Sequence, residues 1–261
     1  MANVKLLTTD RAASGTWSTD SAVSTLPVDN LKTESRRKVW RSVATGTTGA
    51  YAQCDFGSAL SVDVVAFLGV NWSTGATVAI KSSANSDMSS PDVNVSLSSS
   101  GLTPYLDTTT KQFVYPLSAT SARRYWRVTV TDTSLSYIEA GKAILGPAIV
   151  PTINFAPEWR WLSEDLSTVQ RTIGGETYVN VRSIARGVEI EFRAMTAAEA
   201  TGIAYTILRE HGLSKPLLVV LNHDSTAIAR DSIWGLAQEP SEIPYSSGVL
   251  RGLRLRVIER L

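Results

Sequence analysis

Arg124-Tyr125-Trp126-Arg127-Val128-Thr129-Val130-Thr131 alternates bulky apolar side chains with polar ones at every second position. Successive side chains of a β-strand point to opposite faces, so this pattern predicts a strand with one buried face. Trp126, Val128 and Val130 would face the core, whereas Tyr125 and Arg127 would share the other face. The surrounding part of the chain is therefore expected to be built from strands.

Further strands are predicted before this stretch. β-branched residues fill Val62–Val70, a turn-like segment follows at residues 71–75, and Thr77–Lys81 suggests a second strand. Residues 82–100 and 103–111 are rich in Ser, Thr, Asn and Asp, which predicts long polar loops. No apolar repeat of helical period is sustained in this region, so we expect an all-β sandwich.

A boundary between two domains is predicted at Gly146-Pro147-Ala148-Ile149-Val150-Pro151, where two prolines bracket a short apolar stretch. Serine and threonine supply 41 of the first 148 residues but only 17 of the remaining 113. This change of composition supports two domains, residues 1–148 and residues 149–261.

The second domain mixes strands with one helix. Ile153–Trp161 and Val169–Ile173 are predicted strands, and Gly174-Gly175 predicts a two-residue hairpin leading to Tyr178-Val179. Gly187–Arg193 alternates cleanly. Three more strands are expected at 216–221, 228–237 and 250–258.

A capping box at Thr196–Glu199 predicts the start of the helix, because the two side chains can each satisfy an unpaired N–H group. The helix is expected to end at Gly212. We therefore predict a mainly β protein, an N-terminal β-sandwich followed by an α+β domain with one helix packed on β-sheets.

The composition limits the chemistry. The 25 basic and 24 acidic residues give a net charge of +1, which argues against a dedicated nucleic-acid or anionic-membrane protein. Cys54 is the single cysteine, which excludes an intrachain disulfide, and two histidines exclude a histidine-rich metal site. The start, Met1-Ala2-Asn3-Val4-Lys5, lacks the apolar run of a signal peptide, and no stretch of 18 apolar residues occurs, so neither a signal peptide nor membrane insertion is expected. We expect a protein made in a reducing cytoplasm, with no metal and no cofactor.

Two patches in the first domain resemble the discoidin-like (galactose-binding-like) jelly roll. Val39-Trp40-Arg41-Ser42 precedes Tyr51-Ala52-Gln53-Cys54-Asp55-Phe56-Gly57, and Ala122–Val128 is similar to the arginine-aromatic strand of that family. Tyr137–Ala143 stands where its last strand usually lies. The resemblance covers about residues 30–146.

The amino-acid sequences of these patches, together with Leu68–Trp72 and Ile144–Pro147, look most like those of virion proteins of tailed phages. The order of elements after residue 149 is similar to tail-tube and distal-tail proteins. This resemblance implies a hexameric ring subunit at the tail tip or baseplate, made in the host cytoplasm and placed in the virion. Its implied partners are copies of itself and the tube, hub and tape-measure proteins, with no specific nucleic acid.

Candidate ligand-binding residues are aromatic side chains in predicted loops. An exposed ring at Trp17, Trp72 or Tyr105 could stack on a sugar, although local packing or a subunit contact would also explain each of them. Arg36-Arg37-Lys38 with Arg41 is the densest basic cluster, and it could meet phosphate, face solvent or form salt bridges to a neighbouring subunit.

Charged residues on the last strands are candidates for subunit contacts. Opposite charges on neighbouring subunits could pair through the alternating residues Glu189, Glu191, Arg193, Arg254 and Arg256. The spacing of Glu189 and Glu191 would also suit two-carboxylate chemistry. Solvent-facing strands produce the same spacing routinely, and no nucleophile–base constellation accompanies them, so no catalytic residue and no enzyme activity are expected.

Two non-catalytic functions are weighed. The first is the ring-forming structural subunit that joins the tail tube to the distal apparatus. The alternative is a carbohydrate-binding module that attaches the virion to glycans of the host surface. A glycan hydrolase with a binding module is the third and least favoured hypothesis.

Overall fold

The computed structural model describes residues 3–43, 49–223, 225–238 and 250–261, and the chain forms two compact units. Unit 1 holds Thr9–Ala148 and Asn222–Ser232. Unit 2 holds the N-terminal segment up to Thr8, Ile149–Leu221 and Ile233–Leu261. The chain thus changes unit between Ala148 and Ile149, where the sequence suggested a boundary. Two short segments differ from the expected division: the N-terminal segment up to Thr8 lies in unit 2, and Asn222–Ser232 lies in unit 1.

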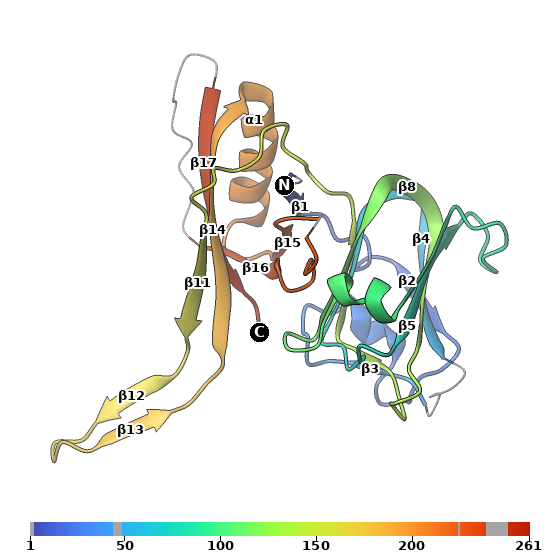
Figure 1. Ribbon diagram of the computed structural model, residues 1–261, viewed down its shortest axis with the longest axis horizontal. Coiled ribbons are helices and arrows are strands. Elements are labelled where there is room, and N and C mark those ends of the chain that lie inside the picture. The colour runs from blue at the N-terminus through green and yellow to red at the C-terminus, as the bar shows by residue number, and fades with distance from the viewer. Residues whose placement is uncertain (1–2, 44–48, 224, 239–249) are drawn as a thin grey trace. The chain divides into compact units, whose positions relative to one another are not determined.

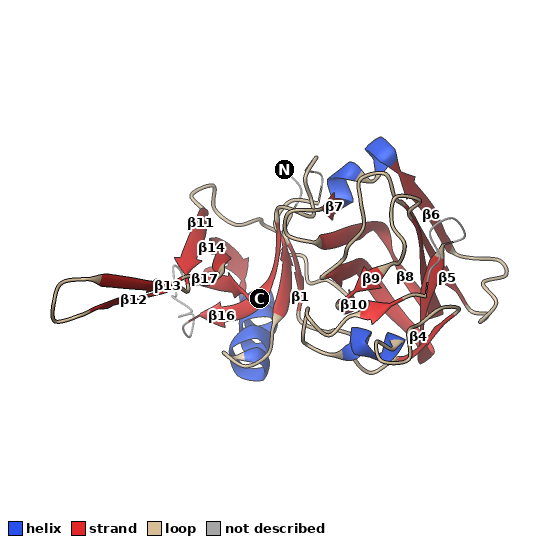
Figure 2. Ribbon diagram, turned by 90° about the horizontal axis from the view of Figure 1, so that it is seen from below, coloured by secondary structure: helices blue, strands red, loops and turns tan. Residues whose placement is uncertain are grey.

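Strands predominate in both units (Figure 2), so the expectation of a mainly β fold is confirmed. Unit 1 has a seven-stranded antiparallel sheet in the order β10-β4-β8-β5-β6, in which β2 also pairs with β4 and β7 with β8. A small separate sheet joins β3 to β9. The strands are β2 (Thr16–Thr19), β3 (Trp40–Arg41), β4 (Ala50–Leu68), β5 (Thr77–Ser83), β6 (Val93–Ser98), β7 (Leu106–Asp107), β8 (Gln112–Thr131), β9 (Glu139–Ala140) and β10 (Lys142–Gly146).

The two long strands β4 and β8 pair along most of their length and bend together (Figure 1). Their register shifts between Asp55 and Leu60 and again between Val62 and Val64, and such irregularities bend a strand pair. Gly57 lies in the bend at φ 76°, a conformation that glycine adopts without steric cost. Each half of the bent pair therefore contributes to a different wall of the sandwich.

Both walls bury their apolar side chains in one core. The first wall supplies Trp126, Val128 and Ile80, and the second supplies Phe67 and Phe113, all at most 4% exposed. Trp126, Val128 and Val130 are buried, as the alternation in their stretch predicts. Three short 3-10 helices complete the unit: η1 (Val28–Lys32), η2 (Ser99–Gly101) and η3 (Thr103–Tyr105).

The prediction of a long polar loop at residues 82–100 is wrong, because β6 lies within it and pairs with β5. Val93, Val95 and Leu97 alternate there with Asn94 and Ser96. The apolar residues of β6 are only partly buried, since the strand lies at the edge of the sheet. The alternation of apolar and polar residues in β6 is short and is flanked by serines, so the sequence did not indicate a strand there.

The segment Asn222–Ser232 is joined to the rest of unit 1 by hydrogen bonds. The side-chain amide of Gln112, at the start of β8, donates to the carbonyl of Ser232 at 3.0 Å and also bonds the carbonyl of Ala229. The N–H of Ala229 donates to the carbonyl of Pro104 at 3.0 Å. These hydrogen bonds satisfy buried polar groups, each of which would destabilise the fold if it had no partner.

Cys54 is expected to resist thiol reagents while unit 1 is folded. Its side chain is fully buried, and burial, with smaller contributions from the charges of Asp10 and Asp55, raises the pKa of the thiol to about 12. At pH 8 only about one thiol in ten thousand would be ionised, and the thiolate is the reactive form. Labelling with a chromogenic disulfide should need denaturant. Stoichiometric labelling of the native protein would contradict this burial.

Unit 2 is a six-stranded sheet in the order β1-β15-β16-β17-β14-β11, with helix α1 (Ala197–Tyr205) packed on one side. Val188, Ile190 and Phe192 of β14 meet Ile203 of the helix in a single core. The strands are β1 (Lys5–Leu7), β11 (Arg160–Asp165), β14 (Ile184–Thr196), β15 (Leu217–Val220), β16 (Ser232–Gln238) and β17 (Leu250–Glu259).

Helix α1 begins with the predicted capping box. Thr196 accepts a hydrogen bond from the N–H of Glu199 at 3.2 Å, and the Glu199 carboxylate accepts one from the N–H of Thr196 at 3.1 Å. The helix continues as a π-helical turn, η4 (Thr206–His211), before Gly212, which has φ 53°. The helix therefore ends where the sequence places it, through a wider turn than expected.

We expect Glu199→Gln to destabilise unit 2 by about 1 kcal/mol at neutral pH, the usual contribution of a helix cap. Hydrogen bonds from Thr152, and then from Thr196, lower the pKa of Glu199 to about 2. A lowered pKa gives stability that is present above the unfolded value near 4.5 and is lost as the pH falls toward 2. Denaturation curves of the variant and the native sequence should therefore converge at low pH. A difference that stays constant down to pH 2 would contradict this role of the carboxylate.

A two-stranded hairpin, which we call the arm, extends beyond the sheet between β11 and β14 (Figure 1). It consists of β12 (Thr168–Arg171) and β13 (Thr177–Asn180). The hairpin was predicted, but its turn is longer than two residues, because the N–H of Thr172 donates to the carbonyl of Glu176 at 2.9 Å. Among the residues described, no helix is long and apolar enough to cross a membrane.

Candidate functional site

One face of the unit 1 sheet, formed by β2, β4, β8, β5 and β6, carries polar and aromatic side chains that we call the polar face. Pairing of the strands places Ser18, Gln53, Arg127, Lys81 and Asn94 opposite one another in a single row. This face includes the side of β8 that the sequence assigned to Tyr125 and Arg127. Neighbouring strands are about 4.8 Å apart, so the row is about 19 Å long.

Arg127 is held flat at the centre of this row. Its Nε donates to Oε1 of Gln53 at 2.7 Å, and its guanidinium carbon lies 4.4 Å from the centre of the Tyr51 ring. A second nitrogen donates to the carbonyl of Ser86 at 3.1 Å. Neutral groups therefore fix the position of this cation, and no carboxylate among the described residues bonds to it.

Arg124 and Asp55 form the second fixed pair beside the polar face. Two guanidinium nitrogens bond the two carboxylate oxygens at 2.7 and 2.9 Å, and the guanidinium lies over the Tyr125 ring at 4.9 Å. The hydrogen bond from Arg124, followed by one from the N–H of Gly57, lowers the pKa of Asp55. The bidentate geometry keeps Asp55 ionised and holds Tyr125 beneath the arginine.

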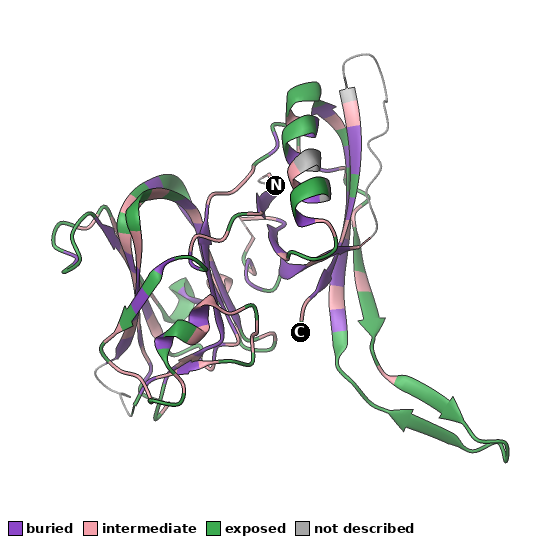
Figure 3. Ribbon diagram, turned by 180° about the vertical axis from the view of Figure 1, so that it is seen from behind, coloured by how far each residue is buried: buried purple, intermediate pink, exposed green. Residues whose placement is uncertain are grey.

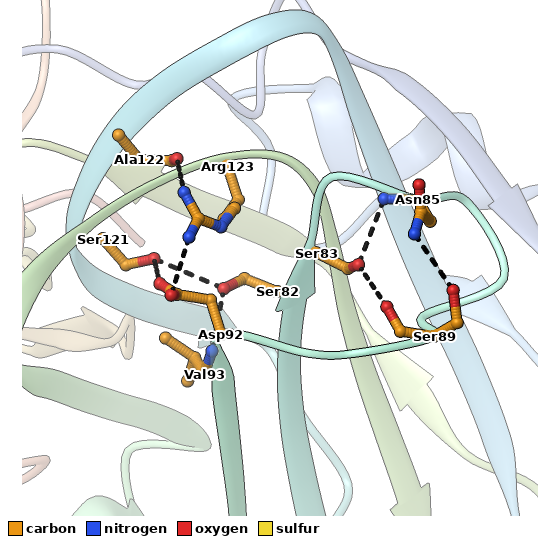
Figure 4. Close-up of polar contacts among 9 residues, drawn as sticks. All are labelled: Ser82, Ser83, Asn85, Ser89, Asp92, Val93, Ser121, Ala122 and Arg123. Atoms are coloured by element: carbon orange, nitrogen blue, oxygen red, sulfur yellow. Dashed lines mark hydrogen bonds and ion pairs between the residues drawn. The ribbon is translucent and has the colours of Figure 1, made fainter.

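The loop between β5 and β6 borders this face and is tied by short polar contacts (Figure 4). The Ser83 hydroxyl donates to the carbonyl of Ser89 at 2.9 Å and accepts from the N–H of Asn85 at 3.1 Å. The Asn85 amide donates to the Ser89 hydroxyl at 3.0 Å. Met88 and Ser90 have positive φ values of 64° and 52°, which are uncommon for residues with a side chain.

The base of the loop is held by Asp92, as Figure 4 also shows. Ser121 donates to Oδ2 of Asp92 at 2.8 Å, and Arg123 bonds Oδ1 at 2.8 Å. The Ser82 hydroxyl accepts from the N–H of Val93 at 3.2 Å. Left-handed backbone at a non-glycine residue costs free energy, and the hydrogen bonds within and below the loop offset that cost beside the polar face.

The aromatic residues suggested for sugar stacking are not exposed as expected. Trp17 lies in β2, is 7% exposed and donates its indole N–H to the carbonyl of Ala12. Trp72 is 2% exposed and packs between Phe67 and Phe113 at 5.7 and 5.4 Å. The expectation of exposed rings is wrong for both tryptophans, because strand β2 and the segment that follows β4 pack these rings into the sandwich core.

Tyr105 differs from the two tryptophans because it is only partly buried. It lies in η3 with its ring edge against Tyr115, and the ring centres are 4.8 Å apart. The structure does not bring Tyr105 to the polar face with Tyr51 and Tyr125. The alternation around Tyr125 was the sequence signal for this face, but its link to Tyr51 depends on strand pairing.

The residues suggested for subunit contacts pair within their own chain. Glu189 accepts a hydrogen bond from Nε of Arg254 at 2.8 Å. Arg193 lies 3.4 Å from Glu191 and 3.3 Å from Glu158. Arg256 stands opposite Glu189 on the neighbouring strand. These charges therefore have intrachain partners or neighbours, and their role between subunits stays a prediction.

The arm is exposed along both of its strands, as the green hairpin in Figure 3 shows, and it carries apolar side chains on both faces. Val169 and Val179 are directly opposite each other and are 61% and 54% exposed. Tyr178 on the other face is 60% exposed, and the tip and the return strand add Ile173 and Val181. The sequence indicated a hairpin here but gave no sign that it would be unsupported.

Among the described residues, no group of three or more His, Cys, Asp or Glu side chains could hold a metal ion. No protein-family model and no curated protein matches the sequence.

Several solved structures are similar to about half of the chain. One is chitosan-binding module 1 of a chitosanase/glucanase from Paenibacillus sp. IK-5, with 17% identity, a TM-score of 0.40, and coverage of 53% of this chain and 99% of that module. The lectin domain of lectinolysin, complexed with Lewis B antigen, has 12% identity and a TM-score of 0.42, covering 55% and 99%. A family 32 carbohydrate-binding module from C. perfringens NanJ, in complex with galactose, has 11% identity and a TM-score of 0.40, covering 54% and 98%. None of these three is a phage tail protein.

Proposed function

We propose that this chain is a self-assembling structural subunit that displays a carbohydrate-binding sandwich. The exposed arm is the observation that supports assembly. An isolated two-stranded hairpin is marginally stable in water, and this one presents apolar side chains on both faces that no described part of unit 2 covers. A contact with another copy would bury these side chains and stabilise the hairpin.

The form of assembly that we propose is a ring at the tail tip or baseplate of a tailed phage. The sequence resemblance and the order of strands and single helix in unit 2 support this proposal. Its partners would be other copies of the chain and the tube, hub and tape-measure proteins, and its location the virion. We propose no catalytic role, because Glu189 and Glu191, the two carboxylates considered, each contact an arginine.

Light scattering of the purified full chain across a wide concentration range tests assembly. A closed ring should give one dominant species with a mass that is a fixed multiple of the protomer. A monomer at every concentration would exclude self-assembly through the arm. If a fixed oligomer forms, electron microscopy of intact phage particles would distinguish a ring at the tail tip from another symmetric oligomer.

Carbohydrate binding is the second function that we propose, and it concerns unit 1. The polar face supports it: planar tyrosine rings lie there among hydroxyl, amide and guanidinium groups, beside a loop tied by hydrogen bonds. Preorganised groups bind with less loss of conformational entropy. A glycan array with the full chain tests this function, and absence of binding to every glycan would exclude it.

A further inference from the structure

Two cations lie side by side on the polar face, and no carboxylate that the structure describes bonds to either of them. Lys81 on β5 is directly opposite Arg127 on β8. Like charges in such cross-strand positions destabilise a sheet. Among the residues that the structure describes, neither side chain forms an ion pair with a carboxylate.

The neighbours of Arg127 explain the position of its side chain, but they do not neutralise the positive charges of Arg127 and Lys81. Gln53 and Tyr51 hold the guanidinium through a neutral amide oxygen and an aromatic face. Hydrogen bonds from Ser89 lower the pKa of Asp87 in the bordering loop, and the nearby charge of Arg127 adds a smaller effect, so Asp87 lies near this cation without bonding to it. An external anion would therefore be stabilised between Lys81 and Arg127.

We infer that the polar face binds an acidic polysaccharide, with a uronate carboxylate seated between Lys81 and Arg127. This inference rests on the proposed carbohydrate-binding function of unit 1. A carboxylate matches the planar fork of a guanidinium, and an ammonium adds a compact second charge. The hydroxyl and amide side chains of Ser18 and Asn94 continue the same row on either side.

The density of charge favours a polyuronate over a nucleic acid. Duplex DNA carries one negative charge per about 1.7 Å and needs several cations along its path. The row of five side chains offers two, and the remaining members are neutral hydrogen-bonding groups. Hydroxyl-rich sugars with one carboxylate per residue fit this mixture of groups.

The test measures retardation of the full chain in gels that contain polygalacturonate, dextran or double-stranded DNA. We expect polygalacturonate alone to retard the protein, and Lys81→Gln/Arg127→Gln to weaken its affinity about tenfold or more, the effect of losing charge-assisted hydrogen bonds. Asp87→Asn, which removes a nearby negative charge, should strengthen binding. Arg37→Gln/Lys38→Gln is the matched control, since it removes two exposed charges of unit 1 outside the row, and it should leave affinity within twofold.

Each contrary result has a distinct meaning. Equal loss in the control pair, equal retardation by DNA, or no loss in the Lys81/Arg127 variant would overturn the inference. Binding to neutral glycans on the array without binding to polygalacturonate would overturn it while leaving the carbohydrate-binding function intact. Retention of native Cys54 protection in each variant verifies that unit 1 is still folded.

Discussion

Replacing Trp72 with alanine is expected to destabilise unit 1 by about 3–5 kcal/mol, the usual cost of removing a large aromatic side chain from a core. The ring is 2% exposed and contacts Phe67 and Phe113, which belong to the two long strands of the sandwich. Its removal would leave a cavity against the rings of Phe67 and Phe113, which are paired on the neighbouring strands β4 and β8. Urea denaturation, followed by the exposure of Cys54 to a thiol reagent, measures the loss.

Trp72→Phe is the matched control. The indole Nε1 of Trp72 is buried and has no hydrogen-bond partner among the described residues, so phenylalanine keeps much of the apolar contact and removes an unsatisfied donor. We expect it to cost much less than alanine. A Trp72→Ala protein with native stability and weakened glycan binding would instead restore this tryptophan as an exposed binding residue.

The second large effect is expected at the arm. Val169→Ser/Val179→Ser should weaken self-association about 100-fold or more, because burial of each valine contributes about 1.5–3 kcal/mol. The two side chains form a cross-strand pair and are exposed in the protomer, so the fold of unit 2 should be unchanged. Concentration-dependent light scattering measures the association.

Thr168→Ser/Asn180→Ser provides the control for the arm. These residues form the adjacent cross-strand pair on the opposite face of the hairpin, and their replacement removes little apolar area. Association should stay within a few-fold of the native sequence. If the valine variant assembles as well as this control, the arm is not the contact between copies.

Local pattern predicted the parts of the fold that depend on neighbouring residues. The alternation at residues 124–131 identified the central strand and its buried face, and Thr196 and Glu199 marked the start of the helix. The strand β6 was missed, because an edge strand among serines buries too little to show a strong pattern.

The candidate site depends on contacts that local pattern does not contain. Lys81 and Arg127 are far apart in the sequence, and only the register of β5 and β8 brings them together. Trp17 and Trp72 were placed in loops by their neighbours, whereas long-range packing decides whether a ring is exposed. Likewise, Glu189 was expected to contact a neighbouring subunit, whereas the pairing of β14 with β17 places Arg254 of the same chain against it.

The exchange of segments between the two units bears on how the chain folds as it is synthesised. Strand β1 at the N-terminus must wait for β15, more than 200 residues later, before it can pair. Unit 1 likewise lacks Asn222–Ser232, which bonds Gln112, until most of unit 2 has emerged from the ribosome. Neither unit can therefore be completed by one contiguous piece of the chain. A chain that ends after residue 148 would form a sandwich without the Asn222–Ser232 segment, and its strand β1 would have no β15 to pair with.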